Sequence, residues 1–197
     1  MAGALLLIGL LFALRLEARS PLKTRTFKTE FLSFNLSNQW DCAMDKAEYV
    51  CRPVSKVKMR EAIIIIAAKI PGKEDNLKAY YDYLKRPKEV VDFKGRSIAS
   101  KVNLIKHKEI KSTQWVDAIH LSGELPNFYT RYLATVKNGI AILVTYSVAK
   151  TKHALYAAEL NRMVASIEVI AKPPQIAAPP EKEKPQNIIT GDREKKK

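Results

Sequence analysis

Cys42 and Cys51 are the two cysteines of the 197-residue chain, and their spacing decides which cysteine chemistry is open to it. A cysteine-based metal site needs three or four ligands at a short, repeated spacing, and a thioredoxin-type redox pair has two residues between its cysteines. Here eight residues intervene, and the nearest histidine in the sequence is His107. The spacing disfavours both kinds of site, so we expect no metal and no other cofactor.

A disulfide across a β-hairpin fits the two cysteines better. If Cys42 pairs with Cys51, Met44 stands opposite Tyr49 and residues 45–48 form a four-residue loop, which is a common hairpin length. Directly opposed residues of an antiparallel pair have the Cα spacing that a disulfide requires. Two free, buried thiols in a cytosolic protein are the alternative. We predict the disulfide, and with it an oxidising compartment.

Side chains that could serve in acid–base catalysis are scattered along the chain. The histidines His107, His120 and His153 belong to no catalytic motif, and the sequence contains no G-x-S-x-G, H-E-x-x-H or P-loop pattern. Asp117 and His120 are three positions apart in a strand-like segment, which places them on opposite faces. Glu124 lies in a loop-like stretch. We therefore name no catalytic residue and predict that the protein is not an enzyme.

The chain is strongly basic, with a formal net charge of +14 from 34 lysines and arginines against 20 aspartates and glutamates. This excess predicts attraction to an anionic partner, such as lipid head groups, an acidic polymer or an acidic protein. The candidate contact residues are Lys56, Lys58, Arg60, Lys106, Lys108 and Lys111. The first three are expected on one face of an extended segment, and an ordinary solvated sheet face is the alternative interpretation. Without an RNA-binding aromatic pattern, a zinc motif or a helix-turn-helix, nucleic-acid binding is not expected.

The N-terminal stretch MAGALLLIGLLFALRLEARS has the features of a signal peptide. Residues 4–14 form an apolar run that is too short to span a bilayer, and Ala18 suits cleavage by signal peptidase. No lysine or arginine precedes the run, whereas Arg15 and Arg19 follow it, which departs from the usual charge arrangement. A buried N-terminal helix is the alternative. We predict a signal peptide over residues 1–18 and a periplasmic or secreted protein.

Two helices are indicated by apolar residues at helical spacing. The first is expected within residues 73–87, where acidic residues stand at the N-terminal end and Pro87 ends the helix. A longer helix is expected from Thr151. The apolar stripes of the two helices are Leu77, Tyr80, Tyr81 and Leu84 in the first, and Tyr156, Leu160, Met163, Val164 and Ile167 in the second.

Strands are indicated by alternating patterns and by the run AIIIIAA, which predicts a fully buried strand. Asn138-Gly139 between two apolar runs predicts a tight hairpin. The predicted strands are 30–36, the two arms of the cysteine hairpin, 62–68, 97–110, 114–125, 127–136, 140–148 and 166–170.

Strands, one helix, further hairpins and a long C-terminal helix together predict a single α+β domain over residues 26–170. Its sheet is expected to be antiparallel with packed helices, as in an α/β/α-like sandwich. From Ala171 onward, proline, lysine and glutamate predominate without large apolar residues. This composition predicts a disordered tail over residues 171–197.

The order of elements resembles the PsbP-like fold, which is shared by extrinsic subunits of photosystems and by Ran-binding Mog proteins. The resemblance covers residues 28–170 and rests on NQW after the first aromatic strand, on the hairpin FYTRYLATVKNGIAILVTYSV and on the helix end MVASIEV. The cysteine pair departs from the family pattern. The resemblance implies a non-enzymatic adaptor or accessory subunit, and it transfers no site residue.

These observations combine into a prediction of a non-catalytic, exported accessory protein of an envelope-associated complex. Its partner is expected to be an envelope protein, an anionic polymer or lipid head groups, with peripheral contact to a membrane. The alternative is a small ligand-binding protein or enzyme with a pocket between the sheet and a helix.

Overall fold

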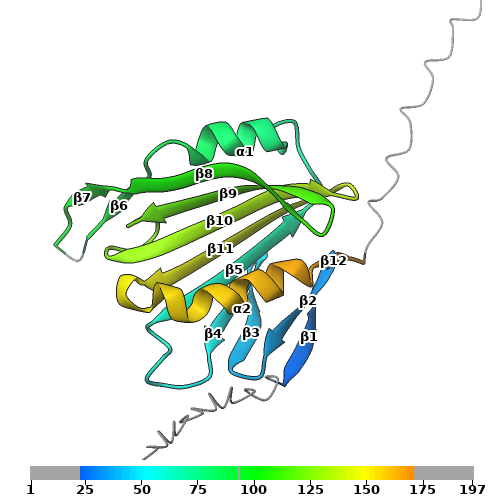
Figure 1. Ribbon diagram of the computed structural model, residues 1–197, viewed down its shortest axis with the longest axis horizontal. Coiled ribbons are helices and arrows are strands. Elements are labelled where there is room, and N and C mark those ends of the chain that lie inside the picture. Colours follow the sequence, from blue (N-terminus) through cyan, green and yellow to red (C-terminus); the bar gives the residue numbers. More distant parts are fainter. Residues whose placement is uncertain (1–22, 93, 171–197) are drawn as a thin grey trace, which may run out of the picture.

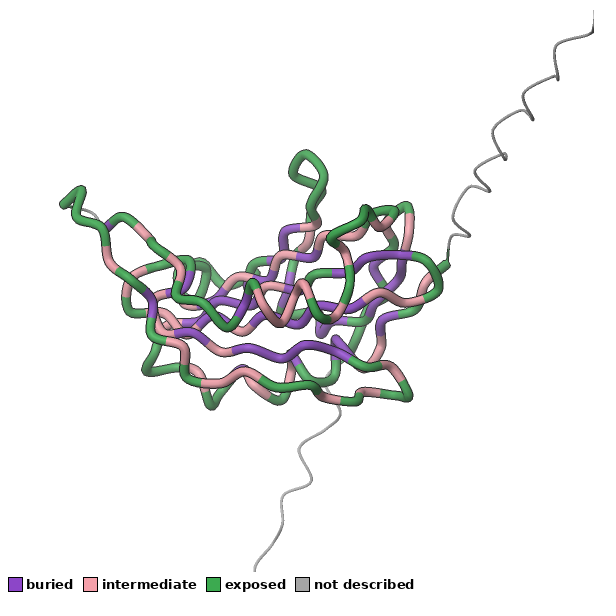
Figure 2. Tube along the Cα trace, turned by 90° about the horizontal axis from the view of Figure 1, so that it is seen from above, coloured by how far each residue is buried: buried purple, intermediate pink, exposed green. Residues whose placement is uncertain are grey.

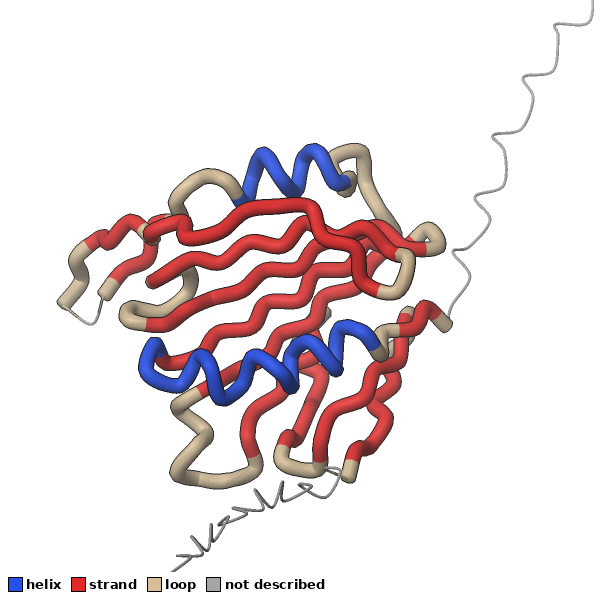
Figure 3. Tube along the Cα trace, in the orientation of Figure 1, coloured by secondary structure: helices blue, strands red, loops and turns tan. Residues whose placement is uncertain are grey.

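A computed structural model describes residues 23–92 and 94–170, so the predicted signal peptide and tail lie outside the described residues. The described part is built on a seven-stranded antiparallel sheet with helices on both faces (Figures 1 and 3). Strand order across the sheet is β3-β4-β5-β11-β10-β9-β8, so the predicted sheet-dominated α+β class is confirmed. The strands are β3 (Trp40–Asp45), β4 (Glu48–Pro53), β5 (Ala62–Lys69), β8 (Lys101–Ile110), β9 (Thr113–Leu121), β10 (Phe128–Lys137) and β11 (Ile140–Ala149).

One face of the sheet packs against helix α2 (His153–Ala165) and a second sheet. That sheet has the order β1-β2-β12 and consists of β1 (Thr24–Lys28), β2 (Leu32–Ser37) and β12 (Glu168–Val169). The apolar stripe predicted for the second helix is buried along its whole length in this core. Because side chains alternate along a strand, Ile64, Leu133 and Ile142 face α2 while their neighbours face the other way. Figure 2 shows the buried residues running along these central strands.

The opposite face is covered only in part, by helix α1 (Leu77–Leu84). Asn76 caps the helix, because its side-chain oxygen accepts a hydrogen bond from the backbone N–H of Ala79 at 2.9 Å. Leu84 packs on Val116 and Tyr132 in a smaller core cluster. A helix of 8 residues is about 12 Å long. It therefore lies over β8, β9 and β10, and leaves β11, β5 and β4 without a helix on this side.

The cysteine hairpin forms as predicted in register but not in loop length. Cys42 lies opposite Cys51, and the two are joined by a disulfide. The ladder continues to the pair of residues 45 and 48, so the predicted four-residue loop is wrong and a two-residue turn replaces it. Lys46 accommodates this tight turn with a φ of 56°. The extra cross-strand pair gives backbone groups partners that a longer loop would leave to solvent.

Four segments differ from the sequence-based expectations. Residues 24–28, which are not among the predicted strands, form β1 and bury Phe27. Residues 62–69 form β5, which is not fully buried, because α1 does not reach over Ile63 and Ile65. Residues 97–110 are divided between β8 and β7 (Ser97–Ala99), which pairs with β6 (Glu89–Val91). Residues 54–61 form turns and not the expected extended segment, with the amide of Met59 donating to the carbonyl of Ser55 at 2.9 Å.

The second predicted helix begins with a short 3-10 turn, η1 (Lys150–Lys152), and continues as α2. The Asn138-Gly139 turn joins β10 to β11 as predicted, with φ values of 50° and 74° at the two residues. Within the described residues no helix has the length and apolarity needed to cross a membrane.

Candidate binding groove beside helix α1

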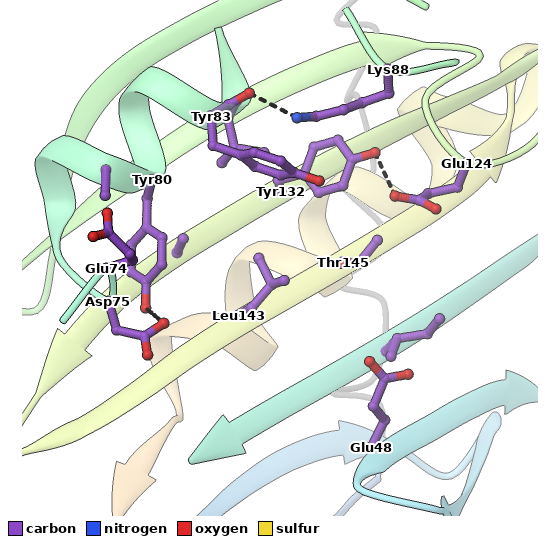
Figure 4. A pocket seen from close by; sticks show the side chains of 14 residues that line it. Glu48, Glu74, Asp75, Tyr80, Tyr83, Lys88, Glu124, Tyr132, Leu143 and Thr145 are labelled. Atoms are coloured by element: carbon purple, nitrogen blue, oxygen red, sulfur yellow. Dashed lines mark hydrogen bonds between the residues drawn. The ribbon is translucent and has the colours of Figure 1, made fainter. Parts of the chain in front are cut away.

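The incomplete cover of the sheet leaves a groove between α1 and the exposed faces of β11, β5 and β4 (Figure 4). Its volume is about 580 Å³, which falls in the usual range for ligand sites. The floor is made by side chains in cross-strand register: Leu143 lies between Ala134 and Ala67, and Thr145 lies next to Ile65. Leu143 remains 39% exposed, although it sits near the middle of a central strand. The floor is therefore an apolar sheet surface with no cover of its own.

One wall of the groove is the face of α1 that carries Tyr80 and Tyr83. The Tyr80 hydroxyl donates to Asp75 Oδ1 at 2.9 Å, and the other carboxylate oxygen of Asp75 pairs with Lys69 Nζ at 2.9 Å and accepts from the amide of Gly72 at 2.7 Å. The Lys69 hydrogen bond lowers the pKa of Asp75, and burial, followed by Asp75, raises the pKa of Tyr80. This network holds the N-terminal end of α1 against β5.

The end of the groove is closed by Tyr132, Glu124 and Lys88. The Tyr132 hydroxyl donates to Glu124 Oε1 at 2.7 Å, and burial, followed by this carboxylate, raises the pKa of Tyr132. Lys88 Nζ donates to the carbonyl oxygen of Tyr83 at 2.7 Å and lies 2.9 Å from the centroid of the Tyr83 ring. Burial lowers the pKa of Lys88. The charges at this end are thus already satisfied by neighbours.

Glu48 and Glu74 stand at the rim of the groove and differ from the other carboxylates there. Within the described residues neither side chain makes an ion pair or a side-chain hydrogen bond, and both are exposed. Figure 4 shows Glu74 near α1 and Glu48 across the floor on β4. The groove therefore combines an apolar floor, an aromatic wall and free negative charge on both sides, in a protein whose net charge is positive.

His120 lies beneath α1 and is fully buried. Its Nε2 lies 2.8 Å from the carbonyl oxygen of Leu84, and its Nδ1 lies 3.0 Å from Ser100 Oγ. Both ring nitrogens are therefore used to join the C-terminal end of α1 and the start of β8 to the sheet.

Gly123 lets the loop after β9 approach Tyr132 and His120 closely, since a Cβ there would lie 2.8 Å from the Tyr132 hydroxyl and 3.0 Å from the Cβ of His120.

Asp117 points to the opposite face from His120, as the strand periodicity predicted. It accepts hydrogen bonds from Arg131 Nε and Nη2, each at 2.8 Å, and Arg131 Nη1 donates to Asn161 of α2 at 2.9 Å. This buried, bidentate pair fixes α2 against β9 and β10. Asp117, His120 and Glu124, which were weighed as acid–base candidates, thus have structural partners. Among the described residues no group of three or more histidine, cysteine or acidic side chains could hold a metal ion.

The six basic residues predicted to bind an anionic partner do not form one surface. Lys56, Lys58 and Arg60 lie in the β4–β5 loop and are exposed. Lys106 and Lys108 lie on β8, and Lys111 lies in the β8–β9 turn. Since β8 is four strand spacings from β5, the groups are about 19 Å apart across the sheet. Figure 1 places the β4–β5 loop at the lower left and the β8–β9 turn on the right side.

The alternative function placed a pocket between the sheet and a helix, but the residues of the groove were not predicted as a site. Tyr80 was expected as part of the α1 stripe, and Glu124 was noted only as a loop residue. The one sequence signal that could have pointed here is the shortness of the first helix, which cannot cover a sheet of seven strands.

The fold of the chain is similar to that of a solved PsbP structure, so the resemblance to the PsbP-like fold predicted from the sequence is confirmed. The solution structure of cyanobacterial PsbP (CyanoP) from Synechocystis sp. PCC 6803 is similar to this chain at a TM-score of 0.53 and 11% identity. The match covers 85% of this chain and 98% of that one.

A second solved structure, the Ran-binding protein Mog1p of Saccharomyces cerevisiae, matches at a TM-score of 0.45 and 8% identity, over 75% of this chain and 96% of that one. No protein-family model matches the chain, and no curated protein matches it in sequence.

Proposed function

We propose that the protein is a non-catalytic accessory protein that binds a segment of a partner protein in the groove beside α1. The observation that carries the proposal is an uncovered apolar floor, with Leu143 exposed at the middle of a central strand. A concave apolar surface with a few polar groups at its edge is the usual form of a binding site. The free carboxylates of Glu48 and Glu74 on either side favour a partner segment that carries basic residues next to an apolar one.

The compartment belongs to the same proposal: the protein works in the periplasm or outside the cell, as part of an envelope-associated complex. The Cys42–Cys51 disulfide supports an oxidising compartment. The signal-like N-terminal stretch supports export. The PsbP-like fold supports an accessory role, because the resemblance to that fold implies a non-enzymatic adaptor or accessory subunit.

Affinity capture from solubilised envelopes tests the groove, with Leu143→Arg as the decisive variant. Leu143→Arg puts a cation and extra bulk on the floor, so the captured partner is expected to be lost, or its recovery reduced at least about tenfold. Leu155→Arg is the matched control, because Leu155 is a 62% exposed leucine on α2, on the other side of the sheet. An equal loss of the captured partner with both variants would contradict the groove as the binding site. Unchanged capture by Leu143→Arg would also contradict it.

A second candidate function is the binding of a small molecule in the same groove. The observation in its favour is the closed end, where the hydrogen-bonded Tyr132–Glu124 pair and Lys88 meet. Native mass spectrometry of the purified protein distinguishes the two functions. A bound small molecule that is displaced in Leu143→Arg would favour ligand binding over a protein partner.

A further inference from the structure

The β4–β5 loop, residues 54–61, exposes three large apolar side chains within a short turn. Val57 is 84% exposed, Val54 is 57% exposed and Met59 is 46% exposed. The loop has a defined backbone conformation, because the amides of Lys58 and Met59 both donate to the carbonyl of Ser55 at 2.9 Å. A hydrogen-bonded turn therefore presents these side chains to solvent in place of folding them onto the core.

Cations alternate with the apolar residues of this loop. Lys56, Lys58 and Arg60 are exposed, and within the described residues none of them makes an ion pair or a side-chain hydrogen bond. The acidic residue of the loop, Glu61, is turned toward the body of the protein: it accepts from the Tyr156 hydroxyl at 3.2 Å and lies 3.9 Å from Lys152 Nζ. The tip of the loop therefore carries uncompensated positive charge.

Apolar and positively charged side chains also line a cleft next to the loop. This cleft has a volume of about 600 Å³, and Val54, Met59 and Arg52 are among the residues that line it. Arg52 is exposed and has no ion-pair or side-chain hydrogen-bond partner within the described residues. The neighbouring Arg25 is by contrast occupied, since its guanidinium donates to Asp41 Oδ1 at 3.0 Å and to the carbonyl oxygen of Trp40 at 2.7 Å. Four free cations thus surround three exposed apolar side chains.

We infer that the β4–β5 loop is a peripheral membrane contact that binds a bilayer rich in anionic lipid. Charge complementarity draws the free cations to lipid phosphates, while Val57 and Met59 enter the boundary between head groups and acyl chains. An acidic polymer would satisfy the cations but would give the apolar side chains nothing to bury against. A nucleic acid would call for aromatic side chains to stack on bases, and the loop has none.

The inference goes beyond the proposed groove and does not depend on it. The loop joins β4 to β5, whereas the groove lies beside α1, and the two sites share no residue. The Leu143→Arg variant is therefore expected to bind vesicles like the wild type, even where it loses its protein partner. Failure of one proposal leaves the other to be judged by its own experiment.

Vesicle flotation with the protein that begins at Arg19, the expected mature N-terminus, tests the inference. It uses phosphatidylcholine vesicles with and without phosphatidylglycerol. Wild-type protein is expected to bind the vesicles that contain phosphatidylglycerol. Lys56→Gln/Lys58→Gln/Arg60→Gln is expected to weaken this binding on the order of 100-fold, because each cation near an anionic surface contributes severalfold. Lys106→Gln/Lys108→Gln/Lys111→Gln is the matched control: it removes the same charge from the far edge of the sheet, and it is expected to bind nearly as tightly as wild type.

A second variant tests the apolar part of the contact. Val57→Ser/Met59→Ser keeps every charge, so it is expected to bind at low salt and to lose the binding that persists for wild type at about 0.5 M salt, where charges are screened. All the changed side chains of the loop are solvent-facing, so circular dichroism melting curves are expected to match the wild type. Because the proteins compared begin at Arg19, the apolar stretch at residues 4–14 does not contribute to the salt-resistant binding.

Three results would overturn the inference. The first is wild-type protein that fails to bind vesicles containing phosphatidylglycerol. The second is equal weakening by the two triple variants, which would assign the attraction to net charge alone. The third is salt-resistant binding that survives in Val57→Ser/Met59→Ser, which would remove the apolar contact and leave a general anion-binding surface.

Discussion

His120 is the residue whose role the structure changes most. The carbonyl of Leu84 can only accept, so Nε2 of His120 carries the proton and Nδ1 accepts from the Ser100 hydroxyl. Burial lowers the pKa of His120, the Leu84 carbonyl opposes this effect, and Lys88 adds to it. A side chain that could have been read as a general base is thus a neutral support for the C-terminal end of α1.

The buried neutral histidine predicts a pH dependence of stability. Between the lowered folded pKa and about 6.5, the unfolded chain binds a proton at His120 that the folded protein does not. The free energy of unfolding is therefore expected to fall as pH decreases from 7.5 to 5.5. Urea unfolding at the two pH values measures this loss, which is expected to be smaller in His120→Gln. Burial also lowers the pKa of His153, but that residue is common to both proteins and cancels in the comparison. Equal losses in the two proteins would contradict this account of His120.

At the scale of elements, the β3–β4 hairpin is the unit in which a covalent bond and strand pairing act together. β3 is the edge strand of the large sheet, and among the described residues β4 is the one strand that pairs with it. The disulfide joins the middle of this pair, where Cys51 is fully buried and Cys42 is half-buried. The hairpin therefore secures an edge of the sheet that lacks a second neighbour.

Removing the disulfide is expected to destabilise the protein without preventing folding. Cys42→Ala/Cys51→Ala should lower the free energy of unfolding by about 2–3 kcal/mol, because a short closed loop regains entropy in the unfolded chain. Calorimetry would show a lower melting temperature, and the core between α2 and the sheet remains large enough to fold. Mass spectrometry of protein from an oxidising compartment is expected to find the Cys42–Cys51 crosslink. Thiols that stay reduced there would contradict a structural bond, and a double variant that is folded but inactive would point to a functional pair.

At the scale of the whole molecule, the proposed sites occupy different parts of one basic domain. Under the two proposals, Glu48 and Glu74 of the groove would attract positive charge, and the lysines and arginines of the β4–β5 loop would attract negative charge. A protein with a net charge of +14 is attracted to anionic surfaces as a whole, so an acidic groove gives specificity that net charge alone cannot provide. The arrangement suits a protein that rests on a membrane and holds a partner.

Export is the prediction that belongs to this scale. A fusion of alkaline phosphatase to the C-terminus is expected to be active, because that enzyme needs an oxidising compartment to form its own disulfides. N-terminal sequencing of the mature protein is expected to begin near Arg19. An inactive fusion, or uncleaved protein in the cytosol, would contradict the proposed compartment. It would leave the groove and the loop to be tested on their own terms.

Local sequence patterns determined both helices, one hairpin turn and the register of the cysteine hairpin. The stripe from Tyr156 to Ile167 and the spacing of Leu77 and Leu84 predicted both helices, because the helical period groups apolar residues on one face whatever lies opposite. Asn138-Gly139 predicted its hairpin, because those two residues adopt positive φ at little cost. The cysteine register followed from strand alternation.

Tertiary structure alone decided the rest. Glu48 and Glu74 lie on opposite sides of one groove because β4 is a neighbour of β5 in the sheet and because Asp75, next to Glu74, pairs with Lys69 at the end of β5. No local sequence pattern specifies that strand order. Arg131 reaches Asp117 only because β9 and β10 pair in one register. The β4–β5 loop folds into turns because its apolar side chains have no core to reach, whereas Ile64 does. Local propensity depends on neighbours in the sequence, but a site depends on neighbours in space. On the face of the sheet covered by α1, the packing of one short helix determined which side chains became neighbours in the groove.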